Sequence, residues 1–126
     1  MSMLTLVLAE SSIGRVPSEL RKHPSVLTHA RRRGKDPASL ILDRSYHHSA
    51  MTMLEKQDKS QSFAKRGRPD IAFHVLLQVL GSPLNREGLL KMCVHTVENK
   101  VIEIDPSLRL PRNYDRFIGL LEQLYE

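Results

Sequence analysis

Several features that mark particular protein classes are scarce or absent in this sequence. Its 126 residues include no tryptophan and one cysteine, Cys93, so no internal disulfide can form. No apolar run approaches the roughly 18 residues of a membrane-spanning helix, and residues 1–8 lack the basic start and small-residue cleavage site of a secretory signal. We therefore expect a soluble protein of a reducing, intracellular compartment with no membrane partner, in which Cys93 is a small apolar strand residue.

Sequence motifs for catalysis and cofactors are also missing. The sequence contains no G-x-G-x-x-G, P-loop or G-x-S-x-G motif, and no spacing suggests a Ser-His-Asp triad. None of the six histidines belongs to an H-x-x-x-H pair or a carboxylate–histidine cluster with metal-ligand spacing, so we expect no metal site. Asp43 and His47 are four residues apart, which predicts a local hydrogen bond on one helix face rather than an acid–base pair. No residue in the chain accounts for a cofactor.

The composition is typical of a small globular domain with a surplus of positive charge. Hydrophobic residues make up 40% and charged residues 26% of the chain, close to globular averages, so we expect one domain over residues 1–126. Lys and Arg number 19 against 14 Asp and Glu, a net charge of +5. This surplus favours a polyanion as partner, although many soluble proteins carry it without binding nucleic acid. Whether the protein binds a polyanion must therefore be judged from where the basic residues lie in the sequence.

The first half of the chain predicts a strand followed by helices. Residues 3–8 form a nearly continuous apolar run, typical of a strand buried on both faces, which favours a parallel sheet covered by helices. Prolines stand where helices can begin within residues 17–54, a stretch that predicts two or three helices. The last of these covers residues 38–54, and Gly34 ends the one before it. The polar residues 55–67 predict a loop.

The second half of the chain completes an α/β layout. Residues 71–80 are apolar and rich in β-branched side chains, which favours a second buried strand, although they also fit the helical period of 3.6. Residues 91–105 alternate around a polar turn and predict a β-hairpin. Residues 111–126 carry the apolar stripe of one amphipathic helix, which runs to the last residue without an end signal, an unusual place for a domain to stop. Together these elements indicate an α/β fold.

Arginines around the last predicted helix are the strongest sign of a binding surface. Arg109, Arg112 and Arg116 are spaced by three and four residues, which predicts that Arg112 and Arg116 share a helix face. With the intervening proline as first helical residue, free backbone N–H groups would lie beside them, a setting suited to phosphate oxygens. A solvent-exposed helix face with ion pairs to Glu122 or Asp115 explains the same pattern.

A second basic element is the segment before the second predicted strand. Gly67 permits close backbone approach and Pro69 fixes the following turn. The Asp70 carboxylate, two residues from Arg68, can hold that guanidinium in one orientation for contact with a phosphate or a base edge. Asp70 is less convincing as a catalytic base, because nothing nearby raises its pKa. A third basic element, residues 31–35, complements the dipole at a predicted helix C-terminus and can also extend a basic surface.

Four segments of the chain match one family in order. They are Leu42-Asp43 with His47-His48, residues 66–71, residues 81–88 and residues 109–117. These segments resemble the archaeal form of the ribosome-biogenesis pseudouridine methyltransferases, the nucleolar essential protein family, also called essential for mitotic growth. The resemblance covers essentially the whole chain, and its last motif is specific.

This resemblance implies a SPOUT-class α/β fold with a β-hairpin insertion and a C-terminal trefoil knot that holds S-adenosylmethionine, in a protein that works as a homodimer. It implies methyl transfer to a ring nitrogen of one pseudouridine in a hairpin loop of small-subunit ribosomal RNA, in the cytoplasm or, in a eukaryote, in the nucleolus. By resemblance, Asp70 orients Arg68 and keeps the RNA-binding loop in shape. Four arginines would bind the RNA: Arg68, Arg109, Arg112 and Arg116.

One departure from the family concerns length. Its members are longer, and the knot with its cofactor loops follows the helix that here ends at Glu126. We therefore expect an N-terminal, RNA-facing portion of such an enzyme, with the cofactor site outside this chain. One alternative is a non-catalytic RNA-binding or ribosome-assembly module, and another is a structural protein whose arginines only solvate a helix.

Overall fold

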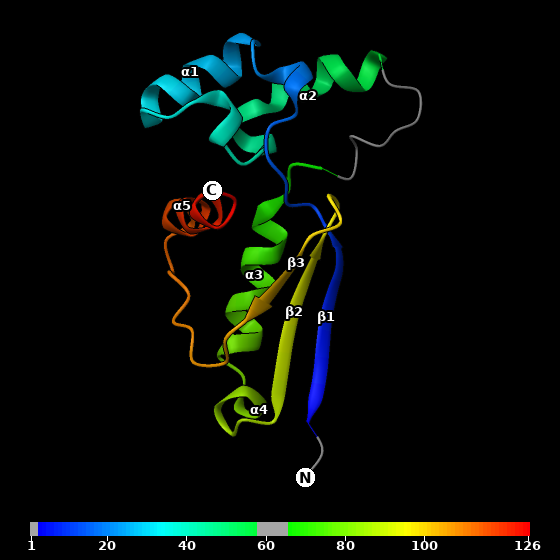
Figure 1. The fold of residues 1–126 in the computed structure, drawn as a ribbon, viewed down its shortest axis with the longest axis vertical. Coiled ribbons are helices and arrows are strands. Elements are labelled where there is room, and N and C mark those ends of the chain that lie inside the picture. The colour runs from blue at the N-terminus through cyan, green and yellow to red at the C-terminus, as the bar shows by residue number, and fades with distance from the viewer. Residues whose placement is uncertain (1–2, 58–65) are drawn as a thin grey trace.

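A computed structural model describes residues 3–57 and 66–126, which form two packed regions (Figure 1). In Figure 1 a helical region lies above a sheet that carries helices on one side. The helical region consists of η1 (Ser18–Leu20), α1 (Pro24–Arg33), η2 (Pro37–Ser39) and α2 (Arg44–Gln57), where η denotes a 3-10 helix. The sheet region consists of β1 (Leu4–Ser11), α3 (Pro69–Leu80), α4 (Pro83–Arg86), β2 (Leu90–Thr96), β3 (Val101–Ile104) and α5 (Tyr114–Leu124).

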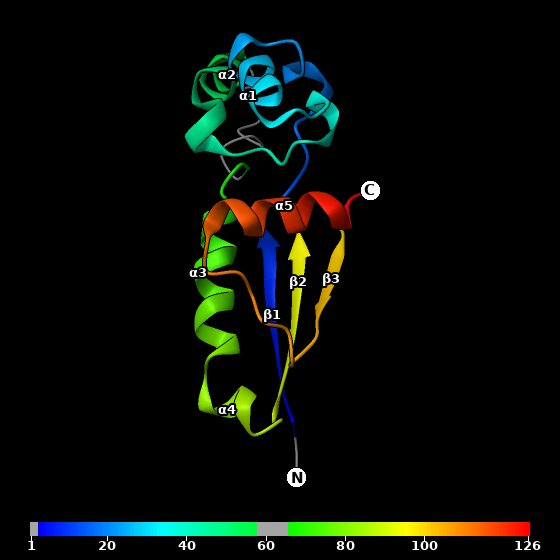
Figure 2. The same ribbon diagram turned by 90° about the vertical axis from the view of Figure 1, so that its left-hand side faces the viewer.

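The sheet is mixed, with strand order β1-β2-β3 (Figure 2). β1 runs parallel to β2, and β2 runs antiparallel to β3. In the tight connection between β2 and β3, Asn99 takes a left-handed φ of 64°, which asparagine tolerates, and its N–H donates to the Thr96 carbonyl oxygen at 2.9 Å. The hairpin predicted over residues 91–105 is thus an antiparallel strand pair, and the predicted α/β class is confirmed.

α3 is a helix, so the second strand predicted over residues 71–80 is wrong and the helical alternative holds. Pro69 occupies the first position of α3, where its missing N–H costs no hydrogen bond. Phe73 and Leu76 are spaced as on one helix face and are buried in the core. Ile71, one of the β-branched residues that suggested a strand, is 48% exposed. Burial therefore follows the helical period rather than the β-propensity of the side chains.

β1 is an exposed edge strand, so the prediction that it is buried on both faces is wrong. Leu4 and Val7 are 53% and 54% exposed, although their side chains point to opposite faces of the sheet. Within the described residues, α3 and α5 cover one face, and the helical region lies beyond the end of the strands instead of on the second face (Figures 1 and 2). The helices predicted over residues 17–54 pack against one another and leave this strand uncovered.

The helical region follows its proline and glycine signals in part. Gly34 adopts a left-handed φ of 64° and ends α1, as predicted. The helix predicted over residues 38–54 begins later than expected, at Arg44. Residues 40–42 are extended instead, because they pair with residues 14–16 through backbone hydrogen bonds of 2.8 and 3.0 Å. A long-range backbone pairing thus replaces the first turns of the predicted helix.

Each region has its own hydrophobic core. In the sheet region, the Phe73 and Phe117 ring centroids lie 5.0 Å apart, and these rings share a core with the strand residues Met92 and Val94. The core of the helical region is aliphatic and contains Val16, Leu20, Val26, Ala30, Leu40, Leu42, Ala50 and Met51. The sheet-region core also includes Ile13, before η1, and Ile41, between η2 and α2, so the junction between the regions holds buried apolar side chains as well as polar ones.

Three further expectations can be compared with the fold. Cys93 is a partly buried free thiol in β2, as predicted for a strand residue. Across residues 3–57 and 66–126, no helix is long and apolar enough to span a membrane. Of the loop predicted over residues 55–67, residues 58–65 lie outside the described residues, whereas residues 55–57 are the last turn of α2.

Candidate nucleic-acid interface

The turn before α3 brings a basic residue to the junction of the two regions. Gly67 has a φ of 76°, a left-handed conformation that favours glycine, and a Cβ atom there would also lie 2.8 Å from the Met51 sulfur atom. The Gly67 carbonyl oxygen accepts the Arg44 N–H at 2.8 Å, and the Arg68 N–H donates to the Ser12 carbonyl oxygen at 3.1 Å. These two backbone hydrogen bonds hold the Arg68 backbone in place and so position its side chain.

Arg68 and Asp70 form a bidentate ion pair, as expected if Asp70 orients the Arg68 guanidinium. The Arg68 Nε and Nη2 atoms each lie 3.0 Å from a carboxylate oxygen of Asp70, which uses two of the five guanidinium donors and fixes the plane of the group. Hydrogen bonding from Arg68 lowers the pKa of Asp70, and the same pair raises the pKa of Arg68. Asp70 is therefore ionised at neutral pH, which suits an orienting role better than that of a general base.

Asp43 and Tyr114 close the hollow in which this ion pair lies. The hollow, about 350 Å³, is lined by Asp43, Arg44, Ser45, Arg68, Asp70 and Tyr114. The Tyr114 hydroxyl donates to one carboxylate oxygen of Asp43 at 2.6 Å. The Ser45 N–H and hydroxyl donate to the other oxygen at 2.9 and 2.6 Å. Burial and the Asp43 carboxylate raise the pKa of Tyr114, so its hydroxyl stays protonated and ties α5 to the start of α2.

The last helix begins later than predicted. α5 starts at Tyr114, because the Asn113 side chain accepts the Arg116 N–H at 3.1 Å and caps the helix. Pro111 is not the first helical residue, and Arg112 precedes the helix. The predictions that Arg112 and Arg116 share a helix face and that free N–H groups follow Pro111 are therefore wrong.

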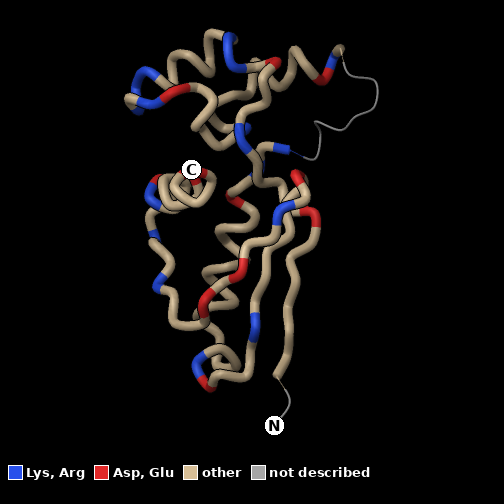
Figure 3. The backbone as a smooth tube through the Cα atoms, in the orientation of Figure 1, with Lys and Arg blue, Asp and Glu red and all other residues tan. Residues whose placement is uncertain are grey.

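The predicted arginines all lie on the surface. Arg109, Arg112 and Arg116 are exposed, as is Arg68. Figure 3 shows basic positions on the connection between β3 and α5, on α5 and on the end of α1, along the same edge of the molecule. Tyr114, which lines the Arg68 hollow, stands between Arg112 and Arg116 in the chain. The structure thus brings the start of α5 to the Arg68 hollow, while Arg109 lies on the connection that leads there.

Two members of the third basic element pair with a buried carboxylate. Glu122 is 1% exposed and accepts hydrogen bonds from Arg33 Nη1 at 2.7 Å and Nη2 at 3.1 Å. Lys35 Nζ lies 2.6 Å from the same carboxylate. Glu122 therefore pairs with Arg33 and Lys35 rather than with the arginines of residues 109–116. Arg31 and Arg32 are exposed, so the element both ties α1 to α5 and adds positive charge to the surface.

A histidine pair lies at the same junction. His47 Nδ1 accepts the Asp43 N–H at 3.0 Å, and His47 Nε2 lies 2.9 Å from His29 Nδ1. Since Nδ1 of His47 is an acceptor, its proton is on Nε2 and is donated to His29. Burial lowers the pKa of His47 to about 4 and also lowers that of His29. The predicted local hydrogen bond between Asp43 and His47 is present, but the Asp43 backbone N–H is the donor and Asp43 precedes α2. The predicted placement of both residues on one helix face is therefore wrong.

Sequence reasoning missed three residues of this junction: Arg44, Tyr46 and Tyr114. Tyr114 fits the apolar stripe predicted over residues 111–126, yet its hydroxyl donates to Asp43. The Tyr46 hydroxyl donates to Asp115 at 3.1 Å, so this carboxylate is also engaged by α2. The available signal for Tyr114 was its place inside the matched segment 109–117. Asp43, the hydrogen-bond partner of Tyr114, is 71 residues away in the chain, so the sequence around Tyr114 could not predict this contact.

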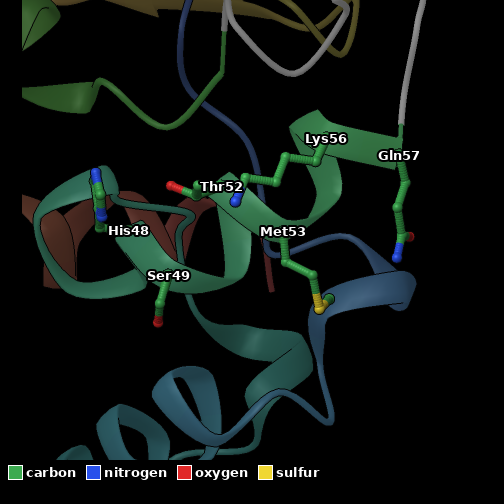
Figure 4. A pocket seen from close by; sticks show the side chains of 6 residues that line it. All are labelled: His48, Ser49, Thr52, Met53, Lys56 and Gln57. Atoms are coloured by element: carbon green, nitrogen blue, oxygen red, sulfur yellow. The ribbon is translucent and has the colours of Figure 1, made fainter.

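A second hollow, about 490 Å³, lies along α2 (Figure 4). It is lined by His48, Ser49, Thr52, Met53, Lys56 and Gln57. These side chains offer one cation and one imidazole, which is not a ligand set for a metal. In the part of the chain that the structure describes, no three His, Cys, Asp or Glu residues are grouped so as to hold a metal ion.

The fold and the arginine-rich junction define an α/β protein with a surface suited to anions such as nucleic acid. The EMG1/NEP1 methyltransferase family matches residues 6–126. The chain belongs to this family, in agreement with the resemblance found from the four sequence segments.

Three relatives illustrate the match. The ribosomal RNA small subunit methyltransferase Nep1 of Thermococcus sibiricus is 48% identical over 124 residues, 98% of this chain and 54% of that protein. The protein of the same name from Pyrococcus furiosus is 47% identical over 123 residues, 98% of this chain and 52% of that protein. The crystal structure of Archaeoglobus fulgidus Nep1 bound to S-adenosylhomocysteine has a TM-score of 0.85 and 41% identity, covering 99% of this chain and 53% of that one. The chain spans about half the length of these relatives.

Proposed function

We propose that this chain supplies RNA recognition for S-adenosylmethionine-dependent methylation of a pseudouridine ring nitrogen in small-subunit ribosomal RNA. The observation that carries the proposal is the 48% identity, over 98% of the chain, to a protein named ribosomal RNA small subunit methyltransferase Nep1. The likeness to a Nep1 structure bound to S-adenosylhomocysteine, the demethylated form of the donor, adds support. Exposed arginines around one polar junction are the independent structural argument.

The RNA ligands in this proposal are Arg68, Arg109, Arg112 and Arg116, with Asp70 as the positioning residue of Arg68. All four arginines are exposed, and guanidinium groups bind phosphates and base edges with two parallel hydrogen bonds. A hairpin loop suits such a surface, because its unpaired bases can turn outward at a smaller cost than bases in a duplex. The chain would thus bind the loop and hold the target nucleotide in one orientation.

The described residues do not fit S-adenosylmethionine. The six glycines of the chain are isolated in the sequence, so no glycine-rich loop offers backbone N–H groups to the donor. The junction hollow is lined by two arginines and two aspartates. Both carboxylates are already engaged, Asp70 by Arg68 and Asp43 by Tyr114 and Ser45, which leaves no unpaired carboxylate among the described residues of this hollow for a sulfonium cation. We therefore assign the cofactor to the part of the relatives that this chain does not span, within a SPOUT fold with a C-terminal trefoil knot. We take the working unit to be a homodimer in the cytoplasm.

RNA binding is tested by fluorescence anisotropy with a labelled RNA hairpin that has a single-stranded loop. Arg112→Ala and Arg116→Ala should each weaken binding by about 1–3 kcal/mol if the arginine contacts a base, or lower the salt slope by about one unit if it holds a phosphate. Arg86→Ala changes an exposed arginine of α4 and should bind like the wild type. Unchanged affinity and slope in both test variants would contradict the proposed RNA surface.

The positioning role of Asp70 is separated from its effect on folding by a double-variant cycle. Arg68→Ala and Asp70→Asn should each weaken RNA binding, and the double variant should bind no more weakly than Arg68→Ala, because Asp70 acts through Arg68. Thermal unfolding of each variant shows whether the protein is still folded. Additive losses in binding would mean that Asp70 contributes independently of Arg68.

The assignment of the cofactor is tested by calorimetry with S-adenosylmethionine. This chain alone should give no binding heat, and binding should return when the remaining half of a relative such as the Thermococcus sibiricus protein is added. Binding by this chain alone would contradict the assignment. RNA binding by the mixture without any donor binding would favour a non-catalytic RNA-binding or ribosome-assembly module.

A further inference from the structure

We propose that a groove between α1 and α2 binds one unpaired nucleotide of the RNA by stacking its base on Tyr46. This inference rests on the proposed function and extends the RNA-binding surface beyond the arginines of the junction. The groove, about 280 Å³, is lined by Pro24, Ser25, Thr28, His29, Arg32 and Tyr46.

Tyr46 is an aromatic platform held at the surface in one orientation. The residue is 38% exposed. The His29 ring covers one face of Tyr46, with the ring centroids 4.2 Å apart and the planes within 9°, so the base in this proposal stacks on the opposite face. The Tyr46 hydroxyl donates to Asp115 at 3.1 Å. Because contacts at the ring and at the hydroxyl already restrict the side chain, little conformational entropy is lost when a base stacks on it. Base–aromatic stacking is a sequence-tolerant way to hold a single-stranded nucleotide.

The charge around the groove also suits a nucleotide. Arg32 lines the groove and is exposed, as is its neighbour Arg31. The next basic residues along the chain, Arg33 and Lys35, are instead paired with the buried Glu122. Arg32 therefore places an exposed guanidinium at the groove beside the Tyr46 ring, an arrangement that matches the phosphate and the base of one nucleotide.

The groove adjoins the arginines of the proposed RNA surface. Asp115, which accepts the Tyr46 hydroxyl, precedes Arg116 in the first turn of α5. On the other side, Tyr46 is two residues from Arg44, which lines the hollow around Arg68. An RNA strand bound at Arg116 can therefore continue onto Tyr46 along one surface. This continuity with a polyanion-binding surface favours a nucleotide over an apolar peptide as the ligand.

Photochemical crosslinking tests the contact on the unaltered protein. The probe is the RNA hairpin with 5-iodouridine at single positions of its loop, a base that crosslinks to aromatic side chains stacked on it. We expect one loop position to give a crosslinked peptide that contains Tyr46, identified by mass spectrometry. Crosslinks confined to Tyr114, to Tyr125 or to peptides outside the groove would overturn the proposal.

A variant pair measures the strength of the contact. Tyr46→Leu keeps an apolar side chain of similar volume but removes the flat ring, and it should raise the Kd for the loop hairpin roughly 5- to 100-fold. The salt slope should stay the same, because no phosphate contact is lost. Binding of a fully paired duplex should be unaffected. Tyr125→Leu, at the far end of α5, is the control and should leave the Kd for the hairpin unchanged.

The outcomes separate this inference from the proposed function. If Tyr46→Leu binds the hairpin like the wild type while Arg116→Ala binds more weakly, the stacking site is wrong and the RNA surface stands. If Tyr46→Leu weakens hairpin and duplex equally, the groove does not select an unpaired base, and the proposal fails. If neither the wild type nor any variant binds the hairpin, the proposed function fails first.

Discussion

The helical region and the sheet region differ in how completely they bury their apolar side chains. In the helical region, Val16, Leu20 and Leu40 are 0% exposed. In the sheet region, Leu4 and Val7 of β1 are more than half exposed, although their core neighbours are well packed. A helix has one apolar stripe to cover, whereas a sheet has two faces. The helices of the helical region therefore bury their apolar side chains against one another, whereas the three described strands have apolar side chains buried on one face of the sheet.

The junction between the two regions is where the arginines of the proposed RNA surface lie. Glu122 of α5 binds Arg33 of the helical region, and the Tyr114 hydroxyl of α5 binds Asp43 at the start of α2. These contacts tie α5, which packs in the core of the sheet region, and with it Arg116, to the helical region. The polar side chains that hold the regions together thereby also orient the surface that would meet the RNA.

The largest expected effect comes from the core of the sheet region. Phe117→Ala removes a 2% exposed ring from α5 and should lower the free energy of unfolding by about 3–5 kcal/mol, through lost burial and the cavity left behind. Leu124→Ala on the same helix changes a 59% exposed residue and should cost less than about 0.5 kcal/mol. Urea titration measures both. Similar losses for the two variants would mean that α5 is not packed on the sheet as described.

A pH titration addresses the polar core of the helical region. The unfolded chain binds a proton at His47 below about pH 6.5, whereas burial keeps the folded chain neutral there down to about pH 4. Unfolding is therefore favoured as the pH falls, and the loss between pH 7 and pH 5 should be about 2 kcal/mol. The lowered pKa of His29 acts in the same direction.

The control for this titration is the neighbouring histidine. His48 is exposed, so His48→Gln should keep the loss of stability between pH 7 and pH 5. His47→Gln should be less stable at pH 7 but should lose less on acidification, because the titrating ring is gone. An equal pH dependence in the wild type and in His47→Gln would contradict the assignment to His47.

Local sequence signals predicted the features that depend on a few neighbouring residues. Gly34 ends α1 because its left-handed conformation is a property of the residue itself. The pairing of Arg68 with Asp70 joins two side chains that are two positions apart in the chain. The antiparallel pair over residues 91–105 is closed by a short connection. In each case the partners are close in the chain, so spacing alone carries the prediction.

Long-range contacts account for several of the predictions that were wrong, whereas the late start of α5 has a local cause in the Asn113 cap. β1 reads as a doubly buried strand, but burial depends on what covers it, and within the described residues the helices lie on one face and beyond the strand ends. Residues 40–42 lose their helical pattern to pairing with residues 14–16. The junction itself joins Tyr114 to Asp43 and Tyr46 to Asp115, over 71 and 69 residues. No window of the sequence contains both partners.

A third prediction tests whether the buried carboxylate couples the two regions. Glu122→Gln keeps the shape of the side chain but removes the charge that pairs with Arg33 and Lys35, and it should cost about 1–2 kcal/mol. The cost is moderate because the two cations are 27% and 30% exposed and can be hydrated. Glu103→Gln changes an exposed carboxylate of β3 and should have no measurable effect. Equal stability of the two variants would mean that the ion pair does not join the regions.

The smallest expected effect lies on β1 and gives the sharpest test of the comparison. Val7→Thr exchanges a methyl group for a hydroxyl on a 54% exposed residue and should change stability by less than about 0.5 kcal/mol. The same exchange at Val94, which is 1% exposed on the adjacent β2, should cost about 1–3 kcal/mol, because the hydroxyl is buried in an apolar core. If Val7→Thr costs as much as Val94→Thr, the outer face of β1 is covered in solution. A cost that rises with protein concentration would then identify a second copy of the chain as the cover, since only association makes stability depend on concentration.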